Sequence, residues 1–231
     1  MYLDTVKNET QKKKIVFLHI PKTAGSSVRE YYDAIFHPEC VKWLGRDFVH
    51  EELKTLSSDD YTVIGGHAGY PTFKHLSDES IFAAVLRDPI QRVFSLYKYM
   101  QRIPTHPHHE ELKGCPFAEC VAQHKPFRES CTNIQTRFLG GSDHSQAIEI
   151  VESNNFMVGI LEYGISGFLE RTVAYSGQPL IKIELGKANV CPKEQRDKFL
   201  FDEKDKGIAF SLNEEDVLLY KYMKKRIEEN E

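Results

Sequence analysis

Short apolar runs separated by amphipathic stretches make up the pattern of hydrophobic and polar positions along this chain. Five runs are rich in β-branched and aromatic residues and are bounded by polar or turn-forming residues, which is typical of strands buried on both faces of a sheet. They lie at residues 14–20, 61–65, 81–86, 156–160 and 180–184. Because helical segments lie between them, we predict that the strands are mostly parallel.

Segments with helical periodicity follow most of these runs. Pro89 stands in the first turn of one segment and Asn213 at the cap position of another, as helix starts commonly show. The expected helices span residues 28–36, 89–101, 117–123, 133–138, 145–153, 164–174 and 213–227. The alternation predicts an α/β fold: a P-loop-like three-layer domain with a central, mostly parallel sheet flanked by helices.

The domain organisation expected from this pattern is simple. Residues 1–13 are polar and predict a flexible N-terminal segment, and residues 14–231 predict one domain. Residues 102–154 predict a helical insertion that caps the ends of the strands, where ligands bind in such sheets.

Composition and charge narrow the classes of function. The 231 residues include 30 Lys+Arg and 34 Asp+Glu, a formal net charge of −4, which argues against a nucleic-acid binder. No apolar run approaches the length of a membrane span. The polar start of the chain, with Lys12, Lys13 and Lys14, lacks the apolar core of a signal peptide. The composition therefore predicts a globular protein with no membrane span in this chain.

The most informative stretch joins the first predicted strand to the first predicted helix. The apolar run stops at Pro21-Lys-Thr-Ala-Gly-Ser-Ser27. A loop in this position points backbone N–H groups toward one spot beside the positive end of the helix dipole. Lys22 adds a charge, and Gly25 lets an anion approach the backbone closely. Further donors are the hydroxyls of Thr23, Ser26 and Ser27. The pattern predicts a phosphate- or sulfate-binding loop.

This loop differs from the Walker A motif of nucleotide-binding proteins. That motif needs Gly-x-x-x-x-Gly-Lys-[Ser/Thr], whereas Lys22 precedes Gly25 by three positions and the first glycine is missing. An alternative interpretation is a buried strand followed by an ordinary helix, with Ser26 or Ser27 as its N-cap. A second motif along the chain favours the anion loop over this alternative.

That second motif stands at the end of another predicted strand. The run at 81–86 ends at Arg87, Asp88-Pro89 turns the chain, and a helix begins. A guanidinium at this edge can hold a phosphate through two hydrogen bonds, and Ser95, about two turns into the helix, can face the same ligand. The alternative is that Arg87 pairs with Asp88 or a nearby carboxylate, and that Ser95 is a helix-surface hydroxyl.

Both motifs resemble those of the PAPS-dependent sulfotransferases, in particular the branch of heparan sulfate 2-O-sulfotransferase and related carbohydrate sulfotransferases. The first loop is similar to the family's 5′-phosphosulfate loop, and Arg87-Asp-Pro-x-x-Arg-x-x-Ser95 is similar to its 3′-phosphate element. Two further stretches support the branch: Asn133-Ile-Gln-Thr-Arg-Phe-Leu-Gly-Gly141 and Phe156-Met-Val-Gly-Ile-Leu-Glu162. The resemblance covers about residues 14–185.

The resemblance implies an O-sulfotransferase that moves a sulfonate group from PAPS to a hydroxyl by direct in-line displacement. A saccharide is the expected acceptor, PAP is the product, and no metal ion is required. Lys22 is expected to stabilise the charge on the leaving group. The expected donor site comprises Lys22, Thr23, Ala24, Gly25, Ser26, Ser27, Arg87 and Ser95. If complete, such a chain is expected to be cytoplasmic; as a trimmed catalytic domain it would come from the Golgi lumen.

The expected general base is His67. In the resembling branch a His-Gly-His motif follows the strand that corresponds to 61–65, and His67 matches its second histidine, which serves as the base. Gly65 replaces the first histidine. A histidine near its ordinary pKa can take a proton from a sugar hydroxyl at neutral pH. The alternative is a loop histidine that donates to a carbonyl. His19 is expected to be a core residue of the first strand.

Two other classes of function stay open at the level of sequence. One is a P-loop-type nucleotide kinase or NTPase, and the other is a non-catalytic module that binds anions or sulfated glycans. The clustered Cys115, Cys120 and Cys131 can form one disulfide in an oxidising compartment or remain thiols. Their spacing and that of His106-Pro-His-His109 match no familiar zinc motif.

Overall fold

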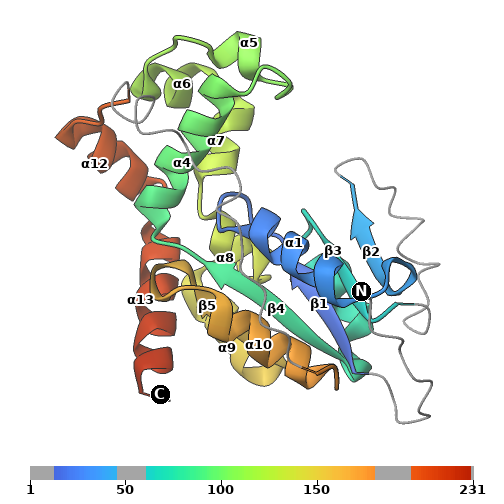
Figure 1. Cartoon of the computed structure of the whole chain (residues 1–231). Helices are drawn as coiled ribbons and strands as arrows, with labels where there is room; N and C mark the ends of the chain where they lie inside the picture. Colours follow the sequence, from blue (N-terminus) through green and yellow to red (C-terminus); the bar gives the residue numbers. More distant parts are fainter. Residues whose placement is uncertain (1–12, 46–60, 180–198, 230–231) are drawn as a thin grey trace.

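A five-stranded sheet forms the centre of the computed structural model, which describes residues 13–45, 61–179 and 199–229 (Figure 1). The strand order is β2-β3-β1-β4-β5, and every neighbouring pair is parallel. The strands are β1 (Lys14–Leu18), β2 (Val41–Leu44), β3 (Val63–Gly66), β4 (Ser80–Leu86) and β5 (Phe156–Ile160). The predicted α/β fold with a parallel central sheet is confirmed.

Four of the five predicted strands have counterparts among the described residues, and the fifth, at 180–184, lies outside them. The first strand ends at Leu18 rather than at residue 20. The hydrophobic pattern does not predict β2, because it is a short strand at the edge of the sheet in which only Leu44 is buried. An edge strand of this kind lacks the continuous apolar run of a central strand.

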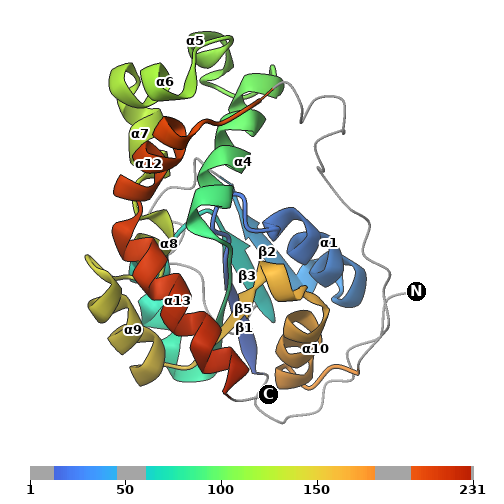
Figure 2. The same cartoon turned by 90° about the vertical axis from the view of Figure 1, so that its left-hand side faces the viewer.

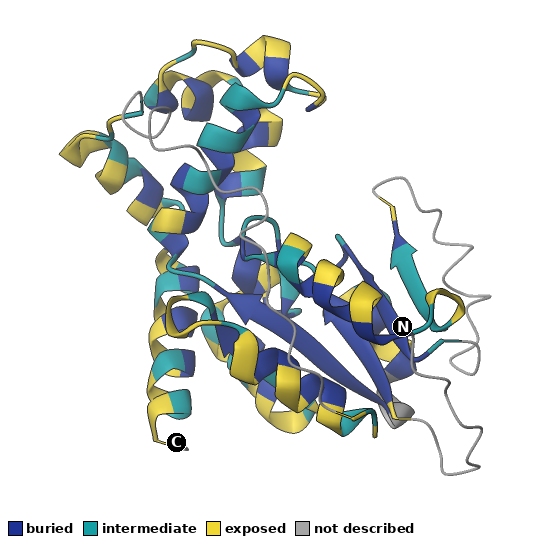
Figure 3. Ribbon diagram, in the orientation of Figure 1, coloured by how far each residue is buried: buried dark blue, intermediate teal, exposed yellow. Residues whose placement is uncertain are grey.

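Helices cover both faces of the sheet (Figure 2). Side chains of β1 alternate between the two resulting cores, as the strand period of two requires. Ile15 and Phe17 face α1 (Gly25–Ile35) and α10 (Ser166–Tyr175) in one core. Val16 and Leu18 belong to the other core. Its helices are α3 (Tyr70–Phe73), α8 (Ile134–Phe138), α9 (His144–Ser153) and α13 (Glu214–Glu228). Figure 3 shows the central strands of the sheet buried along their length, whereas the edge strand β2 is mostly intermediate.

A third core lies beyond the carboxyl end of β4, where α4 (Pro89–Arg102) leaves the sheet (Figure 1). Val93 and Tyr97 of α4 contribute to this core. The surrounding helices are α5 (His109–Leu112), α6 (Phe117–Gln123), α7 (Lys125–Cys131) and α12 (Glu203–Ser211). Within the region 102–154, therefore, α5 to α7 build the third core, whereas α8 and α9 pack on the sheet.

The seven predicted helices all have counterparts, with ends that differ by a few residues. Helices α3, α5, α7 and α12 are not predicted by the pattern. α5 is a single turn, and α12 has few apolar positions and a glycine in its sequence, so neither shows helical periodicity. The described residues also include the short 3₁₀ turns η1 (Pro38–Cys40), η3 (Lys74–Glu79) and η4 (Leu161–Tyr163). Across the three described ranges, no helix has the length and apolar character needed to cross a membrane.

Candidate functional site

The loop between β1 and α1 has an unusual backbone conformation. Lys22 and Ala24 have φ angles of 71° and 68°, in the left-handed region that non-glycine residues rarely adopt, and Thr23 between them has a negative φ. Successive residues of alternating hand turn their N–H groups toward one concavity, which is the geometry of an anion-binding nest. The buried hydroxyl of Thr23 donates to the carbonyl oxygen of Ile20 over 2.9 Å and so closes the loop. The hydrogen of the Thr23 hydroxyl is therefore used within the loop and is not directed at a ligand.

Helix α1 begins directly at this loop. Its N-cap residue is Ala24, which has no side-chain acceptor, and no described side chain caps the first turn. The alternative in which Ser26 or Ser27 is an ordinary N-cap is wrong, because both residues lie inside the helix, where Ser26 is exposed and Ser27 half-buried. An eleven-residue helix without a side-chain cap directs its dipole and its first N–H groups at the nest.

Lys22 extends away from the loop along α4. Its Nζ lies 4.2 Å from the centre of the Tyr99 ring, a cation–π contact. Burial, together with the positive charges of Arg87 and Arg102, lowers the pKa of Lys22 to about 8. Tyr99 and Arg102 join the candidate site although the sequence motifs do not indicate them, since they lie about one and two helical turns beyond Ser95, where the second motif ends. Ser95 shares the face of α4 that carries them, because the three residues are four and then three positions apart.

Arg87 follows β4 and reaches the first loop. Its Nη1 donates to the carbonyl oxygen of Lys22 over 3.3 Å, so the two predicted anion-binding elements lie side by side. Burial lowers the pKa of Arg87, and the carboxylates of Glu162 and Asp88 oppose that effect. The Asp88 carboxylate caps α4 by accepting from the N–H of Gln91 over 2.9 Å, which gives it a role of its own in starting the helix.

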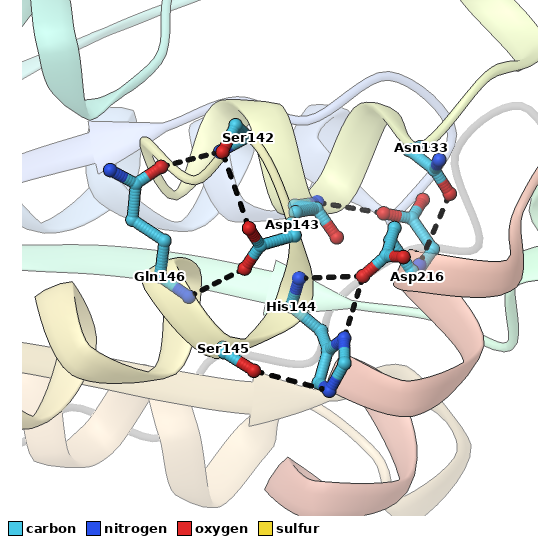
Figure 4. A network of polar contacts seen from close by, with 9 residues as sticks. Asn133, Ser142, Asp143, His144, Ser145, Gln146 and Asp216 are labelled. Atoms are coloured by element: carbon cyan, nitrogen blue, oxygen red, sulfur yellow. Dashed lines mark hydrogen bonds and ion pairs between the residues drawn. The ribbon is translucent and has the colours of Figure 1, made fainter.

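The Asn133–Gly141 stretch holds the main chain of Arg87 through hydrogen bonds. The amide of Gln135 accepts from the N–H of Arg87 and donates to its carbonyl oxygen. Gln135 is in turn fixed by Asp216, whose two carboxylate oxygens accept from the N–H groups of Gln135 and Thr136 over 3.1 and 2.7 Å. Figure 4 shows Asp216 beside Asn133, which accepts from the N–H of Asp216. The stretch therefore positions a site residue through its backbone.

Arg92, the second arginine of the motif, is a core residue. It is fully buried, and its guanidinium donates to the carbonyl oxygens of Ser130 and Cys131 over 3.3 and 3.1 Å. Burial lowers the pKa of Arg92 and raises that of Asp216, and the opposite charge of each partner counteracts both effects. Arg137 is exposed and donates to the carbonyl oxygens of Glu129 and Thr132. Neither arginine points to the nest through these contacts.

His67 and His19 lie together at the carboxyl edge of the sheet. Each is the first residue after its strand, and their rings stack with centres 4.0 Å apart and an angle of 27°. Nδ1 of His67 lies 3.0 Å from the carbonyl oxygen of His19. Because a carbonyl only accepts, Nδ1 of neutral His67 carries the hydrogen and the lone pair is assigned to Nε2. Donation to a carbonyl, the alternative role, is thus compatible with a base at Nε2.

The expectation that His19 is a core residue within the first strand is wrong. Strand β1 ends at Leu18, and His19 is only half-buried. Its ring packs on Gly25: a Cβ placed there would lie 1.9 Å from Cδ2 and 2.0 Å from Nε2 of His19. A side chain at position 25 would therefore have to displace this ring, whatever ligand the loop binds.

The glycine that replaces the first histidine of the His-Gly-His motif also has a structural cause. Gly65 lies opposite Trp43 in the β2–β3 pairing, and a Cβ on Gly65 would lie 2.3 Å from Cζ3 of the Trp43 ring. Trp43 itself stacks on Tyr32 and donates through Nε1 to Asp33 over 2.6 Å. Any side chain at this position competes with the indole, so His67 is the histidine that remains at this strand end.

A separate cluster joins His108, Glu111 and His124 among the cap helices. One Glu111 oxygen lies 3.1 Å from Nδ1 of His108 and 2.5 Å from Nε2 of His124. Nδ1 of His124 accepts from the N–H of Phe127, so Nε2 of the neutral ring carries the hydrogen that Glu111 accepts. This tautomer is that of a hydrogen-bonded helix cap and does not suit a metal ligand at Nε2. The thiols of Cys115, Cys120 and Cys131 are free.

Comparison with known proteins yields fold-level similarities. No family model and no curated protein matches the sequence. The structure of mouse sulfotransferase SULT7A1 complexed with PAP is 17% identical with a TM-score of 0.47, and the match covers 74% of this chain and 61% of that chain. A sulfotransferase from Alicyclobacillus acidocaldarius is 14% identical with a TM-score of 0.48, over 80% and 88% of the two chains. The chain thus spans less than two thirds of the mouse protein.

Proposed function

We propose that this protein is a sulfotransferase that moves a sulfonate group from PAPS to a hydroxyl, with a saccharide as the acceptor. The observation that carries the proposal is the hydrogen bond from Arg87 to the carbonyl oxygen of Lys22, 3.3 Å long. It joins two strand-end motifs, 65 positions apart in the sequence, into one cationic site. The resemblance of both motifs to those of the PAPS-dependent sulfotransferases supports PAPS as the donor.

The donor site in this proposal has two parts. The nest from Lys22 to Ser27 and the start of α1 hold the 5′-phosphosulfate, largely through backbone N–H groups, so Ala24 and Gly25 bind through their main chain. Arg87 and Ser95 hold the 3′-phosphate. Supporting this, Ser95 lies on the face of α4 that Tyr99 presents to Lys22.

The chemistry follows from the residues at the strand ends. PAPS supplies the sulfonate group, and PAP leaves. His67 takes the proton of the acceptor hydroxyl at Nε2, which the hydrogen bond from its Nδ1 to His19 supports. The hydroxyl oxygen forms a bond to sulfur as the bond from sulfur to the phosphate oxygen breaks. Lys22 leaves the Tyr99 ring and neutralises that oxygen, and no protein-bound intermediate is needed.

Calorimetric titration with PAP tests the donor site, and ATP with magnesium tests the nucleotide kinase alternative. We expect PAP to bind, and we expect Lys22→Ala and Arg87→Ala to weaken it by about tenfold or more each, the loss of roughly one charge-assisted contact. Arg128→Ala is the matched control, because Arg128 is exposed on α7. Absence of PAP binding by the folded protein, or equal binding of ATP with magnesium, would contradict the proposal.

Transfer of labelled sulfonate from PAPS to a panel of desulfated and neutral saccharides tests catalysis. We expect His67→Ala to abolish transfer while PAP binding persists. A protein that binds PAP but transfers sulfonate to none of the hydroxyl compounds tested would instead be the non-catalytic anion-binding module.

A further inference from the structure

The backbone of His19 is anchored to two strands. Its N–H donates to the carbonyl oxygen of Gly66 over 2.9 Å, which continues the pairing of β1 with β3 by one residue. Its carbonyl oxygen accepts from Nδ1 of His67 over 3.0 Å. His19 and His67 therefore occupy paired positions at the carboxyl ends of β1 and β3. The main chain of His19 holds the His67 ring through this second hydrogen bond.

The ring of His19 lies between the anion loop and His67. One side packs on Gly25, the first residue of α1, so closely that the three atoms nearest to a Cβ on Gly25 all belong to this ring. One face stacks on the His67 ring at 4.0 Å. Gly25, His19 and His67 thus form a continuous row of contacts from the start of α1 to the expected base.

We propose that His19 is a positioning residue that holds the His67 ring relative to the donor loop and transmits the binding of an anion at the loop to that ring. The proposal rests on the proposed function. An anion in the nest fixes the N–H groups at the start of α1, and Gly25 among them. Because no space separates Gly25 from the ring, fixing one fixes the other, and the stacked His67 ring loses its freedom to tilt.

Nuclear magnetic resonance of the histidine rings, with PAP as the probe, tests this transmission. In the unchanged protein we expect PAP to shift the ring signals of His67, although His67 lies one ring away from the loop. In His19→Ala we expect PAP affinity to change by less than about threefold and the His67 shift to disappear. In His19→Phe, which keeps an aromatic ring at the same place, we expect the shift to return.

These outcomes separate the two proposals. No PAP binding by the unchanged protein would overturn the proposed function. PAP binding with the same His67 shift in His19→Ala would overturn the role of His19 and leave the donor site intact. In the transfer assay, a positioning role predicts that His19→Ala lowers kcat with little change in the KM for PAPS, and that His19→Phe restores part of kcat.

A double-mutant cycle on Gly25 and His19 gives a second test that does not need an acceptor. Gly25 has no positive φ, so the His19 ring is the obstacle that an alanine meets there. We expect Gly25→Ala to weaken PAP binding about tenfold in the unchanged protein and about twofold when His19 is already alanine, a coupling typical of residues in contact. If Gly25→Ala weakened PAP binding equally with His19 present and with His19 replaced by alanine, the proposed transmission through the contact between Gly25 and His19 would be wrong.

Discussion

The side-chain amide of Gln135 forms two hydrogen bonds with the main chain of Arg87, each 2.9 Å long. Its oxygen accepts from the N–H of Arg87 and its nitrogen donates to the carbonyl oxygen, much as a neighbouring strand would. Gln135 is fully buried, and Asp216 holds its own N–H. The guanidinium of Arg87 is therefore aimed at the loop from a main chain that a distant segment fixes in place.

Gln135→Ala should impair PAP binding although Gln135 contacts the loop only through Arg87. Two half-buried backbone groups of Arg87 lose their partners, which costs about 1–3 kcal/mol of unfolding free energy, and the main chain that positions the Arg87 guanidinium is no longer held in place. We expect PAP affinity to fall about tenfold in calorimetry. Gln146→Ala is the matched control, because the exposed Gln146 likewise accepts from a backbone N–H, that of Ser142. An unchanged PAP affinity in Gln135→Ala would show that Arg87 is positioned independently.

Lys22→Met should make the free protein more stable at neutral pH. The folded-state pKa of Lys22 is lowered from 10.5 to about 8, so the folded protein disfavours the ammonium. That cost is fully present below pH 8 and disappears between pH 8 and 10.5, where the unfolded chain binds more protons than the folded one. We expect the unfolding free energy of Lys22→Met to exceed that of the unchanged protein by about 1–2 kcal/mol at pH 7. The difference should vanish near pH 10.5, and urea unfolding measures it. A lower unfolding free energy for Lys22→Met than for the unchanged protein at pH 7 would contradict the prediction that the buried ammonium is destabilising.

PAP binding should take up protons. An anion beside Lys22 favours the ammonium, so its pKa rises from about 8 toward the ordinary value. At pH 8 we expect uptake of about half a proton per PAP bound, seen by calorimetry in buffers of different ionisation enthalpy. Affinity should fall as the pH rises above 8. Lys22→Arg stays charged and should show no uptake; uptake by this variant would assign the proton to another group.

Asp216→Ala should be among the most destabilising single changes in the described chain. It removes the acceptors of two N–H groups at the start of α8 and leaves the buried Arg92 without its opposite charge. Loss of one partner of a buried pair costs about 3–5 kcal/mol. Glu215→Ala, one residue away and half-buried, removes two contacts to His144 and should cost about 1 kcal/mol or less. Urea unfolding of both variants provides the comparison.

The central strands and the two strand–loop–helix elements of the candidate site could be predicted because each is a continuous local pattern. An apolar run followed by a polar turn and a helix predicts β1 with α1 and β4 with α4, and both pairs are present. The edge strand β2 and the polar helix α12 lack such a pattern, since neither is an apolar run and α12 has few apolar positions.

The parts of the site that the sequence does not reveal depend on contacts between distant segments. Tyr99 joins the candidate site because its ring contacts the Lys22 side chain. Arg92 is a core residue whose guanidinium donates to the carbonyl oxygens of Ser130 and Cys131, and whose charge interacts with that of the distant Asp216. Gly65 interrupts the expected motif because Trp43 of the unpredicted β2 occupies the space above it. None of these relationships is visible in the spacing of residues along one segment.

The position of Lys22 against Tyr99 has a consequence for chemical reactivity. With a pKa of about 8, roughly a tenth of Lys22 is a neutral amine at pH 7, far more than for a lysine with an ordinary pKa. A neutral amine is a nucleophile, and the neighbouring aromatic ring offers a surface on which an aryl reagent can stack. Lys22 should therefore be acylated or sulfonylated faster than exposed lysines such as Lys125, and bound PAP should protect it. Because burial disfavours the charged form of Lys22 and so increases the fraction of neutral amine, this lysine should be a target for covalent inhibitors.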